Sequence, residues 1–109
     1  MDQVPTSVCT DVRGLFIDYT RSAGGVRVVV AGEIDMASAP LLEDHLAVAC
    51  NAAERVELDL SEVSFMDSQG LRVLLVAQRD SSVPITVVAT SPRVRRVLDL
   101  TGTAGLLLA

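Results

Sequence analysis

The stretch Leu58-Asp-Leu-Ser-Glu-Val-Ser-Phe-Met-Asp-Ser-Gln-Gly-Leu71 joins a strand pattern to a helix pattern. Apolar and acidic residues alternate over residues 56–60, which predicts a strand with one buried and one solvated face. Apolar residues recur over residues 71–76 in a pattern compatible with a helix. A tight turn over residues 67–70 lies between the two, and binding surfaces of α/β proteins form at such carboxyl ends of strands.

Ser68 lies in this turn and has two interpretations that the residues alone leave open. Its hydroxyl either caps the following helix by accepting a hydrogen bond from a backbone N–H, or is presented to a partner. The adjacent Asp67 is open in the same way, because it either contributes to the cap or orients the Ser68 hydroxyl. A hydrolase nucleophile is not supported, since no Gly-x-Ser-x-Gly pattern, candidate base or His/Cys/carboxylate cluster surrounds Ser68.

Upstream of this stretch, the sequence predicts a β-hairpin followed by a helix. Two runs of strand-forming residues, Leu15–Tyr19 and Val26–Ala31, flank a glycine-containing turn. A loop over residues 33–38 leads to the helix, and Pro40 is compatible with its first turn. The apolar positions of this helix lie three or four residues apart and form one face: Ala39, Leu42, Leu46, Ala49 and Ala53.

Downstream, the pattern predicts a helix over residues 69–80, a strand over residues 85–89 and a third helix capped by Ser91. Residues 106–108 predict a short strand or a capping tail. The order is β-β-α-β-α-β-α, an α/β fold with a mixed sheet of four strands, or five if the last segment pairs. Acidic residues on one face of the strands favour helices mainly on the other face, and helical connections favour parallel neighbours.

The segment from Phe65 to Leu71 resembles the phosphorylation segment of the STAS domain family, in particular the single-domain bacterial anti-anti-sigma factors (anti-sigma factor antagonists). The family pattern is Asp-Ser-Ser-Gly-Leu, and its first Ser receives the phosphate. That position is Ser68 here, whereas Gln69 replaces the second Ser of the pattern.

Two further blocks carry the same resemblance. Residues 32–35, Gly-Glu-Ile-Asp, are similar to a turn of the family whose Asp lies at the partner surface, and residues 91–102 are similar to its last conserved helix. The three blocks occur in family order. The resemblance implies a phosphorylation site at Ser68 and partner contacts from the residues around it: Glu33, Asp35, Asp67, Gln69, Gly70 and Leu71.

The resemblance also implies a function. The unphosphorylated protein would bind an anti-sigma factor that is also an ATP-dependent serine kinase, and so release a sigma factor. Phosphorylation of Ser68 would end that complex, and a phosphatase would reset it. The alternative is a STAS subunit that binds the ATPase of a lipid-transport complex. A third possibility, a small-molecule or nucleotide sensor, has no P-loop pattern to support it, and an enzyme is the least favoured class.

Composition limits the remaining possibilities. The 109 residues predict a flexible N-terminal arm over residues 1–12 and one STAS domain over residues 13–109. A net charge of −5 argues against direct nucleic-acid binding. No signal peptide and no apolar run long enough to cross a membrane are visible, so we expect a cytoplasmic protein without membrane insertion.

The sequence predicts neither a metal site nor a cofactor site. Cys9 and Cys50 form no metal-binding motif, and reduced thiols are favoured over a disulfide. His45, the sole histidine, has no matched catalytic or metal-ligating partner in the sequence and is expected at the surface.

Overall fold

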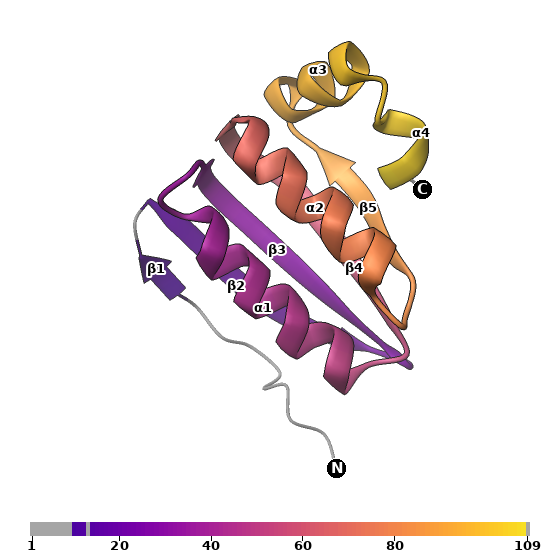
Figure 1. Cartoon of the computed structure of the whole chain (residues 1–109). Coiled ribbons are helices and arrows are strands. Elements are labelled where there is room, and N and C mark those ends of the chain that lie inside the picture. The colour runs from indigo at the N-terminus through magenta and orange to yellow at the C-terminus, as the bar shows by residue number, and fades with distance from the viewer. Residues whose placement is uncertain (1–9, 13, 109) are drawn as a thin grey trace.

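The computed structural model describes residues 10–12 and 14–108 and shows a five-stranded sheet in the order β1-β2-β3-β4-β5 (Figure 1). Its elements, in chain order, are β1 (Thr10–Val12), β2 (Leu15–Ser22), β3 (Gly25–Ile34), α1 (Ala39–Ala52), β4 (Arg55–Met66), α2 (Ser68–Asp80), β5 (Ile85–Thr90), α3 (Pro92–Thr101) and α4 (Ala104–Leu107).

The sheet is mixed, as the sequence predicts. β2 pairs antiparallel with β1 and with β3, so the predicted hairpin of β2 and β3 is confirmed. β4 pairs parallel with β3 on one side and with β5 on the other, which confirms the parallel neighbours expected from helical connections. In Figure 1 the carboxyl ends of β3 and β5 lie at the same end of the sheet as the first turn of α2.

Helices α1 and α2 lie side by side across one face of the sheet (Figure 1). Alternate strand residues point into the core beneath them, which is almost entirely aliphatic, and include Leu15, Ile17, Val26, Val28, Val30, Val56, Leu58, Leu60, Ile85 and Val87. The opposite face carries polar side chains, such as the ion pair between Arg27 Nη2 and Glu57 Oε1 at 3.1 Å. The alternation of apolar and polar residues along the strands is therefore typical of a sheet that helices cover on one face.

β4 continues to Met66, six residues beyond the predicted strand. The register with β3 shifts between Val29 and Ala31, which pair with Asp59 and Glu62, so β4 contains one extra residue there. A β-bulge of this kind changes which residues face the core, and the buried positions that follow Leu60 are Val63 and Met66. The strict alternation of apolar and polar residues stops at the bulge, but the strand itself continues to Met66.

β3 also runs further than predicted, through Gly32 to Ile34. Gly32 has a φ of +99°, and a Cβ built on it would lie 2.1 Å from the backbone oxygen of Gly14. Only glycine fits this close approach between β3 and the start of β2.

The two ends of the chain differ from the prediction. Residues 10–12, the last part of the predicted arm, form β1, whereas residues 1–9 lie outside the described residues; the division into an arm and a domain stays a prediction. The fifth strand is therefore contributed by the N-terminal segment. Near the other end, α4 replaces the predicted strand or tail, and Leu108 forms a single parallel bridge with Val87.

Candidate phosphoacceptor site at the strand ends

The two segments that carry the predicted site residues are joined at the ends of parallel strands. Ile34 and Met66 are register partners at the ends of β3 and β4. The N–H of Asp67 then donates to the backbone oxygen of Ile34 at 3.1 Å, which extends the pairing one residue into the turn. Asp35, which begins the loop to α1, and Asp67, which directly precedes α2, therefore follow adjacent strands at the same end of the sheet.

Asp67, and not Ser68, is the N-cap of α2. Its backbone is extended, with φ −102° and ψ −172°, and its Oδ1 accepts hydrogen bonds from the N–H groups of Gln69 at 2.9 Å and Gly70 at 3.0 Å. The interpretation of Ser68 as the cap is wrong, because Ser68 is the first residue of the helix itself. Of the two interpretations of Asp67, the structure shows the capping one.

Ser68 is exposed, and its hydroxyl makes no hydrogen bond to any other described residue. Since Asp67 already satisfies the first amides of the helix, the Ser68 hydroxyl is left available at the surface. Gln69 is exposed beside it, so the residue that replaces the family's second Ser lies on the surface and leaves the acceptor position open.

Asp35 is fixed within its own loop by Ser38. The Asp35 Oδ1 accepts hydrogen bonds from the N–H groups of Ser38 and Ala37, both at 3.0 Å. These bonds, that from the Ser38 N–H first, hold the pKa of the Asp35 carboxyl below its usual value, so it is ionised at neutral pH.

Ser38 fixes the loop that carries Asp35, and the sequence analysis did not single it out. It is fully buried, and its Oγ donates to the backbone oxygen of Glu33 at 2.7 Å and accepts from the N–H of Asp35 at 3.0 Å. The spacing Asp35-x-x-Ser38 just ahead of a proline-containing helix start is the signal that indicates such a side-chain-stabilised turn.

Gly70 and Leu71 point inward, unlike the other predicted contact residues. A Cβ on Gly70 would lie 2.5 Å from Cγ2 of Ile34 and 2.9 Å from Cγ of Met66, so the first turn of α2 packs directly on the strand ends. Leu71 is only 8% exposed and belongs to the core. Gly70 has no side chain to offer a partner and the Leu71 side chain is buried, so both residues position the turn that carries Ser68.

We call the outward-facing residues at this end of the sheet the switch surface: Glu33, Asp35, Met36, Phe65, Ser68 and Gln69. Glu33 and Phe65 are register partners on β3 and β4, which places them next to each other. Phe65 is 38% exposed and Met36 is 74% exposed, so both large apolar side chains reach the solvent. The switch surface thus includes apolar side chains and carboxylates as well as the exposed Ser68 hydroxyl.

The sequence of residues 17–109 matches the family model described as "Mlab, STAS domain". The chain belongs to the STAS domain family. Within it, the chain is 32% identical over 91 residues to an anti-sigma-B factor antagonist of Bacillus subtilis, a match that covers 79% of this chain and 82% of the relative.

Solved structures agree with this membership. The crystal structure of an anti-sigma factor antagonist from Mycobacterium paratuberculosis superposes with a TM-score of 0.77 at 33% identity, over 85% of this chain and 82% of the other. The unphosphorylated anti-sigma factor antagonist SpoIIAA gives a TM-score of 0.70 over 84% of this chain and 85% of the other; at 20% identity it supports the fold alone. The predicted STAS fold and the homology to anti-sigma factor antagonists, which are non-enzymatic regulators, are thereby confirmed.

The described part of this STAS domain holds no group of three or more His, Cys, Asp and Glu side chains arranged to bind a metal ion. Over the same residues, no helix has the length and apolar character needed to cross a membrane.

The one histidine of the STAS domain is not a simple surface residue. His45 on α1 is half-buried, and its Nδ1 is hydrogen-bonded to the hydroxyl of Tyr19 on β2, with the two ring centroids 5.5 Å apart. Burial raises the pKa of Tyr19 to about 12 and lowers the pKa of His45, the latter against the opposing field of Asp44. The expectation of a surface histidine is corrected to a packing contact between α1 and the sheet.

Proposed function

We propose that this STAS domain is a cytoplasmic anti-sigma factor antagonist whose partner binding is controlled by phosphorylation of Ser68. The unphosphorylated form binds an anti-sigma factor with serine kinase activity and so releases a sigma factor. The kinase transfers a phosphoryl group from ATP to the Ser68 Oγ, the hydroxyl proton leaves and ADP is the second product. A phosphatase restores the hydroxyl by hydrolysis.

The observation that carries this proposal is the exposed hydroxyl of Ser68, which makes no hydrogen bond to the described residues because Asp67 supplies the cap of α2. Ser61 offers a contrast on the neighbouring strand. It is also exposed, but its Oγ donates to Asp59 Oδ1 at 2.6 Å. A kinase would have to break that bond at Ser61, whereas Ser68 needs no rearrangement.

The fold should tolerate a phosphate at Ser68. A phosphoserine carries about −1.5 to −2 charges at neutral pH. At the first position of α2 the helix dipole favours that charge by about 0.3–1 kcal/mol, which offsets part of the repulsion from the neighbouring carboxylate of Asp67. No unfolding of the helix start is therefore expected.

A partner docked on the switch surface would respond strongly. Asp35 is ionised, and a new dianion near it must be desolvated when the interface forms. Juxtaposed like charges at an interface cost several kcal/mol, and about 1.4 kcal/mol already corresponds to a tenfold loss of affinity. The switch can therefore act through charge alone, without a large conformational change.

The test is phosphorylation and binding with purified candidate anti-sigma kinases encoded in the source genome. Intact mass should show one added phosphate on the wild type and on Ser61→Ala, the matched control, and none on Ser68→Ala. Ser68→Asp should bind at least about tenfold more weakly than the wild type, in line with an interfacial charge penalty.

Equal binding by wild type, Ser68→Ala and Ser68→Asp, with no phosphate on any of them, would contradict the switch. That result would indicate a constitutive adaptor, as in the alternative of a STAS subunit bound to a transporter ATPase.

A further inference from the structure

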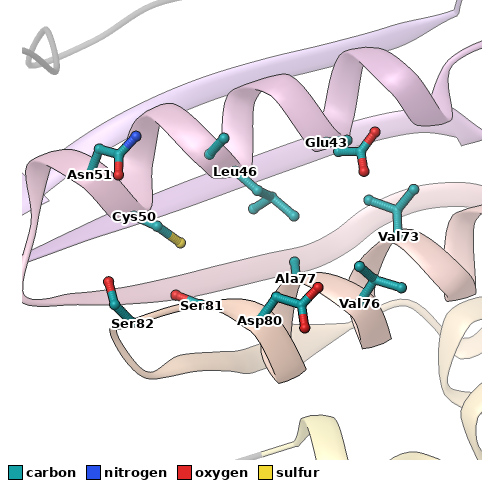
Figure 2. Close-up of a pocket in the computed structure, with 11 residues that line it drawn as sticks. Glu43, Leu46, Cys50, Asn51, Val73, Val76, Ala77, Asp80, Ser81 and Ser82 are labelled. Carbon is teal, nitrogen blue, oxygen red and sulfur yellow. The ribbon is translucent and has the colours of Figure 1, made fainter.

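A groove runs between α1 and α2 on the surface of the domain. It encloses a cavity of about 360 Å³, and its walls are mostly apolar side chains of the two helices: Leu46, Ala47, Cys50, Val73, Val76 and Ala77. Figure 2 shows the Sγ of Cys50 directed from α1 toward α2, into the space between the helices. An apolar hollow on the surface is typical of a binding site rather than of a solvated face.

The rim of this groove is acidic. Glu43 on α1 and Asp80 on α2 both line it, and α1 contains no Arg or Lys. Asp80 pairs with Arg79 at 2.8 Å, whereas Glu43 has no ion pair within the described part of the chain. The groove therefore favours an occupant that brings a positive charge close to apolar side chains.

The groove continues to the switch surface. A second hollow of about 300 Å³ is lined by Met36 and Gln69, which belong to that surface, and by Arg72. The same hollow shares Glu43, Val73 and Val76 with the α1–α2 groove. A partner that covers Ser68 and Met36 thus reaches the groove without leaving the protein surface.

We propose that the α1–α2 groove is a second docking site for the anti-sigma kinase, and that it receives a segment with apolar side chains beside a Lys or Arg. The inference rests on the proposed function and adds a second contact to it. Arg72 lines the hollow near Ser68 together with Glu43, so the basic residue of the partner lies on the far side of Glu43, between Glu43 and Asp80. The net charge of −5 is consistent with a partner of opposite sign.

This arrangement divides the interface into two parts. The part around Ser68 changes charge on phosphorylation, whereas the groove contact keeps its composition in both states. Groove substitutions should therefore weaken the binding of the wild type and of Ser68→Asp by a similar factor. Substitutions at positions that share no contacting residue change the binding free energy additively.

Charge reversal and steric filling test the groove, each with a neighbouring control on α1. Glu43→Arg should weaken binding at least about tenfold, whereas Asp44→Arg, which makes the same charge change at an exposed residue outside the groove lining, should change it by no more than about twofold. Ala47→Trp fills the groove, and Val48→Trp adds the same side chain at a residue outside the lining that is 46% exposed. Circular dichroism and thermal melts confirm that each variant is folded.

Cys50 supplies an independent measurement that needs no groove substitution. In a Cys9→Ser protein, N-ethylmaleimide should alkylate Cys50, and saturating amounts of the kinase should slow that reaction at least about tenfold if its segment covers the groove.

The outcomes separate this inference from the proposed function. Loss of binding in Ser68→Asp, with groove variants that bind like their controls and no protection of Cys50, overturns the groove inference alone. Failure of every candidate kinase to bind the wild type overturns the proposed function and the groove inference with it. A small molecule that occupies the groove without displacing the kinase, and without changing the protection of Cys50 by the kinase, would also contradict the inference.

Discussion

Ser68 and Ser91 make an instructive pair, because each lies at the start of a helix that follows a parallel strand. Ser91 is the N-cap of α3; its Oγ accepts from the N–H of Val94 at 3.2 Å, and the residue is only 8% exposed. Ser68 lies one position further into its helix, because Asp67 takes the capping position of α2. Where the residue before the serine takes the capping position, as Asp67 does, the serine hydroxyl stays exposed; where the serine is itself the cap, as Ser91 is, its hydroxyl bonds the helix.

The largest expected effect comes from removing the close contact that anchors α2. Gly70→Ala places a Cβ where Ile34 and Met66 already lie, so the free energy of unfolding should fall by about 1–3 kcal/mol in urea denaturation. Gly105→Ala is the control, since a Cβ there meets no atom within 4 Å. Equal stability of the two variants would show that the start of α2 is not tightly packed on the strand ends.

The serine pair itself gives the next largest difference. Ser91→Ala removes a buried cap and should lower the free energy of unfolding by about 1 kcal/mol, within a range of about 0.5–2 kcal/mol. Ser68→Ala removes no hydrogen bond to the residues that the structure describes and should stay within about 0.5 kcal/mol of the wild type. A destabilised Ser68→Ala with an unaffected Ser91→Ala would reverse the comparison.

An effect of similar size but greater chemical specificity is expected at Asp67. Asp67→Ala should cost about 1 kcal/mol of unfolding free energy, whereas Asp67→Asn should cost less than about 0.5 kcal/mol, because Asn caps helices about as well as Asp. Thermal and urea unfolding at neutral pH measure both. If Asp67→Asn lowered the free energy of unfolding as much as Asp67→Ala, the negative charge of Asp67, and not its capping hydrogen bonds, would be what stabilises the turn.

The smallest effect concerns pH and contrasts a charged turn with the neutral cap at Ser91. The pKa of Asp35 is lower in the folded protein than its ordinary value of 3.8, so the folded state favours the ionised form. The resulting stability is fully present above about pH 4 and is lost as the pH falls through the lowered pKa. Asp35→Asn should flatten this acid limb of the stability curve; an unchanged limb would exclude Asp35 as its source.

Much of the fold follows from patterns that local physics controls. The alternation over residues 56–60 and the three-or-four spacing from Ala39 to Ala49 correspond to buried faces in the structure. Pro92 at the first position of α3, with Ser91 as its cap, is also as predicted. In each case the period or the cap is a property of neighbouring residues, so the sequence carries the information directly.

The remaining features depend on contacts between distant residues. Asp67 and Ser68 are both good capping residues, and only the extended backbone of Asp67, fixed by its bond to Ile34, selects between them. The bulge that shifts Val63 into the core is set by pairing with β3, and His45 becomes half-buried only because Tyr19 lies opposite. No local pattern reports these choices.

The hydrogen bond from Asp67 to Ile34 also has a consequence for the entropy of recognition. Because sheet pairing extends into the turn and Gly70 packs on the same strand ends, the loop at Asp35 and the start of α2 are held in place before any partner arrives. A prearranged surface of this kind loses little conformational freedom on association, so more of the contact energy appears as affinity. Because little of the contact free energy is offset by ordering of the surface, a modification that only adds charge acts on nearly the whole binding free energy.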